Sequence, residues 1–130
     1  MKYILMMNAP KGGWDGLMSW PQEVQQAHIR FMMGFTKKLT DAGELVSADG
    51  LTPPTEAKLV RAGKNGAPVI DGVFAETKEF LAGWWIVEVS SPERAYQIAA
   101  EASAAPGPQG PLNMPIEVRQ VANCPPPETL

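Results

Sequence analysis

The sequence predicts one α+β domain in which an antiparallel sheet carries two helices on the same face. Segments of strand and helix character alternate as strand, helix, strand, strand, helix, strand, with a hairpin signal inserted in the middle. Right-handed crossovers turn that order into one sheet with both helices on one side, the ferredoxin-like arrangement. The chain has 130 residues, of which 45% are apolar and 19% charged, as expected for a single globular domain.

The N-terminal segment "KYILMMN" is a continuous apolar run that predicts a strand with both faces buried. Residues 9–18 contain three glycines and a proline without periodicity, which predicts a loop. A helix is expected to begin at Ser19, because its spacing to Gln22 is that of a capping box and Pro21 is tolerated in a first turn.

Gly43 is placed to end this helix at its C′ position. The stretch "ELVSADGL", residues 44–51, then predicts a second strand, which the two prolines that follow would end. Two short strand segments at residues 57–63 and 67–72 flank Asn65-Gly66. Asn-Gly is the strongest short hairpin signal, so we expect a hairpin inserted into the fold.

The segment "GWWIVEV", residues 83–89, predicts another strand. Ser91 and Pro92 are typical of a helix start, and that helix is expected to extend through "ERAYQIAAEASA". "PIEVRQVA" is the last expected strand. The predicted domain therefore covers residues 1–122, followed by a proline-rich tail over residues 123–130.

The predicted strands are apolar on both faces of the sheet, although two helices can cover only one. Trp85, Val87 and Val89 share one face of their strand, whereas Trp84 and Ile86 share the other. A second copy of the chain, packed sheet to sheet about a two-fold axis, is the expected cover. The sequence thus predicts a homodimer in which one of the two tryptophans is core and the other faces the interface or a pocket.

Charge and composition exclude several classes of function. The net charge is -3 and no Lys/Arg run occurs, which argues against direct nucleic-acid binding. Cys124, the only cysteine, lies in the tail, so no internal disulfide and no oxidising compartment are implied. The apolar N-terminal run is too short for a signal peptide. We therefore expect a cytoplasmic protein without a membrane partner. One histidine and one tail cysteine cannot form a zinc site, and no cofactor is predicted.

The stretch "DGVFAETKEFLAGWWIVEV", with "KYILMMN" and "GELVSADGL", resembles the YCII-related family, specifically its DGPF branch, over about residues 1–122. Asp71-Gly72, Phe74 and residues 76–79 match the branch motif, and Val73 replaces its proline. The resemblance implies a dimeric α+β barrel. It also implies an association with extracytoplasmic-function sigma factors, because members of this branch are often encoded beside them or fused to them.

The resemblance also places a candidate catalytic histidine. "AHIRF" puts His28 where the family has its proposed active-site histidine, but the region after the second helix, "AAPGPQG", lacks the aspartate that completes the family's pair. An imidazole suits proton transfer near neutral pH if a carboxylate orients it. Asp71 is the first candidate for that carboxylate, and Glu76, Asp49 and Glu88 are alternatives. A hydrogen-bonded core histidine is the structural alternative.

A charged cluster, Glu76, Lys78 and Glu79, directly precedes the aromatic strand. We expect these side chains, with Trp84, to line the mouth of a ligand cavity; a solvated turn is the structural alternative. Asp71-Gly72 is by itself typical of a turn.

Two functions remain open at this point. The first is a non-catalytic homodimeric module that binds a small ligand or a protein partner, and it is favoured because the expected aspartate is absent. The second is a lyase or isomerase that acts on small acidic or enolisable compounds with His28 as acid/base. An open pocket with a carboxylate within hydrogen-bond reach of His28 would favour the enzyme, and a sealed apolar contact would favour the module.

Overall fold

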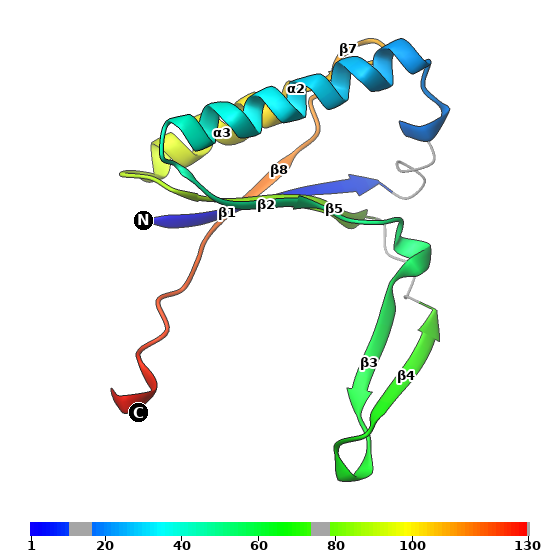
Figure 1. Cartoon of the computed structure of the whole chain (residues 1–130), viewed down its shortest axis with the longest axis vertical. Coiled ribbons are helices and arrows are strands. Elements are labelled where there is room, and N and C mark those ends of the chain that lie inside the picture. The colour runs from blue at the N-terminus through cyan, green and yellow to red at the C-terminus, as the bar shows by residue number, and fades with distance from the viewer. Residues whose placement is uncertain (11–16, 74–78, 130) are drawn as a thin grey trace.

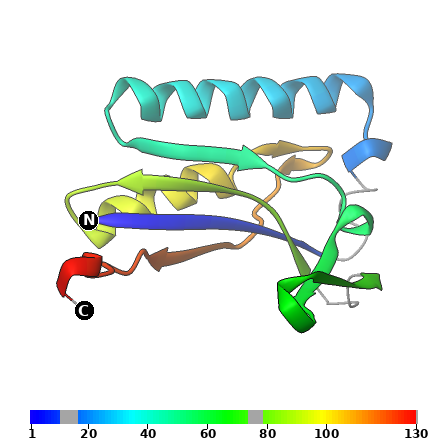
Figure 2. The ribbon, with the colours of Figure 1, turned by 60° about the horizontal axis from the view of Figure 1, so that its bottom comes forward.

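The computed structural model describes residues 1–10, 17–73 and 79–129. Within these residues, two helices lie over one face of an antiparallel sheet (Figure 1), so the predicted ferredoxin-like α+β arrangement is confirmed. The strands of this sheet are β1 (Lys2–Pro10), β2 (Leu45–Gly50), β5 (Glu79–Glu88) and β8 (Ile116–Gln120). The helices are α2 (Gln22–Asp41) and α3 (Pro92–Ser103). Figure 2 shows the strands side by side in the order β2-β5-β1-β8.

Two strands form the predicted hairpin outside the main sheet. β3 (Lys58–Ala62) pairs antiparallel with β4 (Pro68–Val73), and the connecting Asn65 and Gly66 have φ angles of 63° and 77°. Positive φ angles are what an Asn-Gly pair supplies in a hairpin turn, so this prediction is confirmed. Asp71 and Gly72 lie within β4, however, and their interpretation as a turn is wrong.

Short elements complete the described chain. After α3, the two-residue strands β6 (Pro106–Gly107) and β7 (Gly110–Pro111) pair with each other. Single 3-10 turns occur at η1 (Pro54–Glu56), η2 (Lys64–Gly66) and η3 (Pro127–Thr129).

The helix ends agree with the sequence signals at Gly43 and Ser91 but not at Ser19. The N-cap of α2 is Pro21, with no side-chain cap, so the capping box predicted at Ser19 is wrong. Residues 17–19 are already helical, which moves the cap position beyond Ser19 and shortens the loop expected over residues 9–18. Gly43 follows the end of α2 with a φ of 71°, as predicted for C′. In α3, the Ser91 hydroxyl accepts a hydrogen bond from the Arg94 N–H at 3.2 Å, as an N-cap should.

The hydrophobic core lies between the sheet and the two helices. Its largest side chains with less than 2% of their surface exposed come from four elements: Leu5, Leu39, Val87 and Ile98. The Phe35 ring of α2 meets the Trp85 ring of β5 edge-on, with centroids 5.6 Å apart. α3 contributes small side chains, which let its backbone approach the sheet closely: Ala95, Ala99 and Ala102.

The opposite face of the sheet, which we name the open face, is also apolar at its centre. Ile4 pairs with Ile86 and Met6 with Trp84 in the register of β1 and β5. These side chains alternate with the helix-facing residues and are half-buried, and both helices lie on the other side (Figure 1). Trp85 is therefore the core tryptophan, and Trp84 belongs to the open face.

An ion pair between Glu44 and Arg94 joins the start of β2 to α3. The Arg94 guanidinium donates two hydrogen bonds to the Glu44 carboxylate, both 2.8 Å long. These hydrogen bonds hold the pKa of Glu44 below its ordinary value of 4.5, against an opposing effect of burial. Because the folded pKa is depressed, the pair contributes stability above the unfolded pKa and loses it as the pH falls through the folded pKa.

We expect Glu44→Gln to lower the free energy of unfolding by about 1–2 kcal/mol at neutral pH, between the values for exposed ion pairs and for charged hydrogen bonds. The difference from the wild type should disappear at acidic pH, where Glu44 itself is protonated. Urea unfolding of the variant and the wild type, measured from neutral to acidic pH, tests this expectation. Asp41→Asn is the control, because its pair with Lys37 is exposed and should contribute little. A difference that did not change with pH would contradict the expectation.

Candidate functional site

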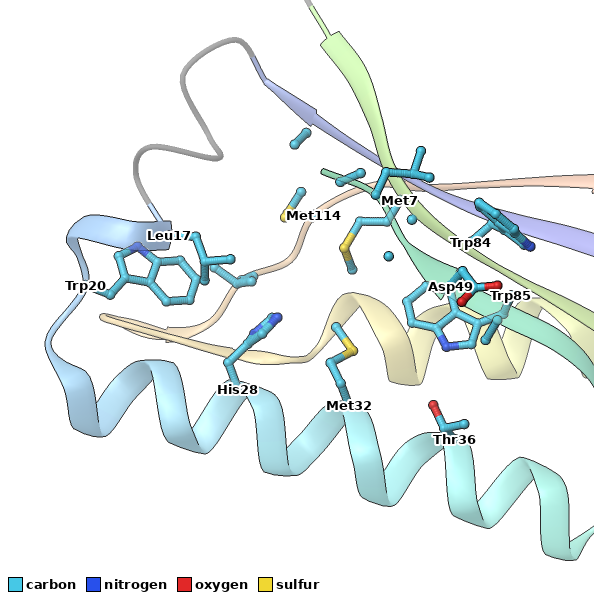
Figure 3. Close-up of a pocket in the computed structure, with 17 residues that line it drawn as sticks. Met7, Leu17, Trp20, His28, Met32, Thr36, Asp49, Trp84, Trp85 and Met114 are labelled. Carbon is cyan, nitrogen blue, oxygen red and sulfur yellow. The ribbon is translucent and has the colours of Figure 1, made fainter. Parts of the chain in front are cut away.

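A cavity of about 440 Å³ lies between α2 and the sheet (Figure 3). Ligand pockets in proteins typically measure ~300–1,000 Å³, so its size is that of a small-molecule site. The side chains around it are predominantly apolar and come from segments far apart in the sequence: Met7, Leu17, Trp20, Met32, Trp85, Leu112 and Met114.

The helical wall of the cavity is formed by His28, Met32 and Thr36. Residues four apart lie on one face of a helix, so the spacing alone aligns these three side chains. Phe35 and Leu39 lie beside this row and are buried in the core, which holds α2 against the sheet. Packing of the helix thus positions the imidazole at the cavity.

His28 is one of the polar side chains that line the cavity, together with Thr36 and Asp49. Its ring points toward the cavity in Figure 3, and its Nδ1 atom lies 3.1 Å from the carbonyl oxygen of Pro106. A carbonyl can only accept, so Nδ1 carries the proton and Nε2 of the neutral ring keeps a free lone pair. The ring of Trp20 meets the imidazole edge-on at 5.7 Å between centroids. The ring is therefore held in one orientation and one tautomer.

Pro106 belongs to β6, in the stretch "AAPGPQG" that lacks the expected aspartate. The β6-β7 pairing fixes this segment, and a backbone carbonyl orients the ring where a carboxylate was expected. A carbonyl holds the tautomer as a carboxylate would, but it brings no negative charge to stabilise an imidazolium. Within the described residues, the geometry at His28 favours binding through Nε2.

The sheet wall includes a close approach of two strands at Gly83. A Cβ atom there would lie only 2.9 Å from the carbonyl oxygen of Asp49, so a side chain at this position would push β2 from β5. The glycine therefore lets β2 and β5 pair closely where they line the cavity. In the register of the sheet, Asp49 lies opposite Trp84.

Asp49 and Trp84 line the same cavity as His28, whereas the structure separates Asp71 and Glu88 from it. Asp71 lies on the hairpin, where its carboxylate pairs with Arg61 at 2.7 Å, and it is not among the described residues that line the cavity. Glu88, on β5, is exposed and lies 3.4 Å from the N-terminal ammonium group of Met1. Neither carboxylate is positioned to orient the imidazole.

The predicted cavity rim is described only in part. Glu76 and Lys78 lie outside the described residues. Glu79 is the exposed first residue of β5 and is not among the described lining residues. Trp84 borders the cavity, but alternation along β5 directs its ring to the open face and that of Trp85 toward α2 (Figure 3).

Several lining residues were not singled out from the sequence. Met32 and Thr36 could have been found, because they follow His28 at helical spacing. Trp20 and Met114 carry no local signal, since they reach the cavity only through the packing of segments distant in the chain.

Two chemical features are missing from the part of the chain that the structure describes. Residues 1–10, 17–73 and 79–129 contain no group of three or more His, Cys, Asp or Glu side chains that could hold a metal ion. Among the same residues, no helix has the length and apolar character needed to cross a membrane.

Comparison with known proteins gives two matches. Residues 1–107 match the family model described as the YCII-related domain. An uncharacterised protein of Rhizobium meliloti (strain 1021) is 32% identical over 104 residues, which cover 80% of this chain and 81% of that protein. The family match includes both His28 and Pro106.

Proposed function

This chain belongs to the YCII-related family, and from that premise we propose that it is a homodimeric protein that binds a small, largely apolar ligand beside His28. The observation that carries the proposal is the 440 Å³ cavity, in which methionine and tryptophan side chains surround one oriented imidazole. Mostly apolar walls with a few placed polar groups are typical of small-molecule sites.

The chemistry of the cavity indicates the class of ligand. Tryptophan and methionine side chains pack favourably against aromatic rings. Nε2 of the neutral imidazole accepts a hydrogen bond, so a hydroxyl or N–H group of the ligand is its natural partner. We therefore propose an aromatic compound with a phenolic or similar weakly acidic donor.

The homodimer is supported by the open face. Ile4, Met6, Trp84 and Ile86 form an apolar centre on a sheet whose helices lie on the other side. Soluble proteins seldom leave such a face to water, and an isologous pair of identical faces satisfies both copies at once.

We expect a simple phenol, such as 4-ethylphenol, to quench or enhance the fluorescence of Trp20 and Trp85 as it enters the cavity. His28→Gln should raise its dissociation constant about fivefold, because one hydrogen bond contributes roughly 1 kcal/mol. Titration followed by tryptophan fluorescence measures this. Ile29→Gln is the matched control, since it puts the same side chain one residue along, at an exposed position. No saturable binding of any phenol in a series of increasing ring substitution would contradict the proposal.

The second candidate is a lyase or isomerase of small acidic or enolisable compounds with His28 as acid/base. The open cavity and the free lone pair of Nε2 favour it, because a base must reach its substrate. The carbonyl partner of the ring favours binding instead. Turnover of an enolisable aromatic acid by the wild type, lost in His28→Gln with binding retained, would establish the enzyme.

The association with an extracytoplasmic-function sigma factor stays a prediction from the family resemblance, as does the cytoplasmic location. Copurification of a sigma factor with the tagged chain from its native cells would test the first.

A further inference from the structure

The hairpin of β3 and β4, residues 58–73, forms an arm that extends away from the sheet. In Figure 1 the arm extends below the sheet, on the side opposite the helices. The rotation to the view of Figure 2 turns the arm toward the reader. It is therefore on the same side of the molecule as the open face.

The two faces of the arm differ in chemistry. Val60 pairs with Ile70 and Ala62 with Pro68, so these four residues share one apolar face. Val60 and Ile70 are 56% and 61% exposed. The other face carries the Arg61–Asp71 ion pair and Val69, which pairs with Arg61.

An exposed apolar face on a lone hairpin needs an explanation. A two-stranded hairpin by itself is at best marginally stable in water, and it gains stability when a hydrophobic face packs against something. The described residues leave the β-branched pair Val60 and Ile70 largely open to solvent. The face with Val60 and Ile70 lacks the Arg61–Asp71 ion pair of the other face and carries the more exposed apolar side chains, so a partner is expected on it.

The area of the open face indicates how much further apolar surface a dimer would need. Strands about 4.8 Å apart are paired over five residues at the two edges and nine between β1 and β5. At about 3.4 Å per residue, the four-stranded sheet has a face of about 19 by 17–31 Å, on the order of 300–600 Å². A stable interface uses about 800 Å² from each partner. The sheet face alone is too small for a stable dimer, and additional apolar surface must come from elsewhere in the same chain.

We propose that the apolar face of the arm packs against the partner subunit of the homodimer. The inference rests on the proposed dimer: a second copy on the open face lies beside the arm, because both are on the same side of the sheet. Two-fold symmetry then places each arm against the other subunit. The Arg61–Asp71 face points to solvent in this arrangement.

The test compares two neighbouring substitutions on the same strand. Ile70→Glu puts a carboxylate on the apolar face, whereas Val69→Glu puts one on the charged face beside Arg61. The dimer dissociation constant, measured by sedimentation over a dilution series, is expected to rise at least tenfold for Ile70→Glu and to change less than about threefold for Val69→Glu. Circular dichroism checks that both variants keep their fold.

A second measurement does not depend on any substitution. Lys64 lies at the tip of the arm, and an amine-reactive crosslinker applied to a mixture of unlabelled and ¹⁵N-labelled protein should join it to lysines of the other isotope. A wild type that dimerises without such crosslinks would overturn the role of the arm but not the dimer. Equal effects of the two substitutions on the dimer dissociation constant would have the same meaning. A wild type that stays monomeric would overturn the dimer itself.

Discussion

Trp85→Ala is expected to lower the free energy of unfolding by about 3–5 kcal/mol, the usual cost of removing a buried large aromatic side chain. Trp85 is only 7% exposed and meets the Phe35 ring edge-on between β5 and α2. Its loss would enlarge the cavity beside His28, and the surrounding side chains could fill the gap only in part. Urea unfolding at several protein concentrations measures the effect.

Trp84→Ala is the matched control for this substitution. The two residues are adjacent, but the ring of Trp84 lies on the open face, outside the core. The cost of Trp84→Ala should depend on protein concentration, because Trp84 lies in the proposed dimer interface, whereas the cost of Trp85→Ala should not. A small, concentration-dependent loss for Trp85→Ala would contradict its place in the core.

Trp84→Glu is expected to convert the proposed homodimer into a monomer. The wild type should have a mass of roughly twice 14.1 kDa in solution, and the variant 14.1 kDa. In the proposed dimer, the two-fold axis brings two copies of the new carboxylate into an apolar interface, where an unpaired charge is strongly unfavourable. Light scattering coupled to gel filtration at micromolar concentration measures the masses.

Tyr96→Glu serves as the control for an added charge, because Tyr96 is 56% exposed on α3, on the helix side of the molecule. It should leave the dimer unchanged. A Trp84→Glu variant that kept the dimer mass would show that the two copies meet through another surface.

Most of the elements could be predicted from the sequence because their signals are local. Gly43 ends α2, Ser91 caps α3 and Asn65-Gly66 turns the hairpin, each through bonds or φ angles within a few residues. The order of strands and helices, with the handedness of their connections, was then enough for the ferredoxin-like sheet. The His28 position on the inner face of α2 follows from helical spacing in the same way.

The features that the sequence did not predict depend on contacts between distant segments of the chain. Alternation along β5 shows that Trp84 and Trp85 point in opposite directions, but the helices determine which one is core. Asp71 looked like a turn residue until pairing with β3 placed it on the arm. The partner of His28 lies 78 residues away, and it is a backbone carbonyl, which every residue carries and no sequence pattern marks. Local hydrogen bonds leave a signature in the sequence, whereas contacts made by packing do not.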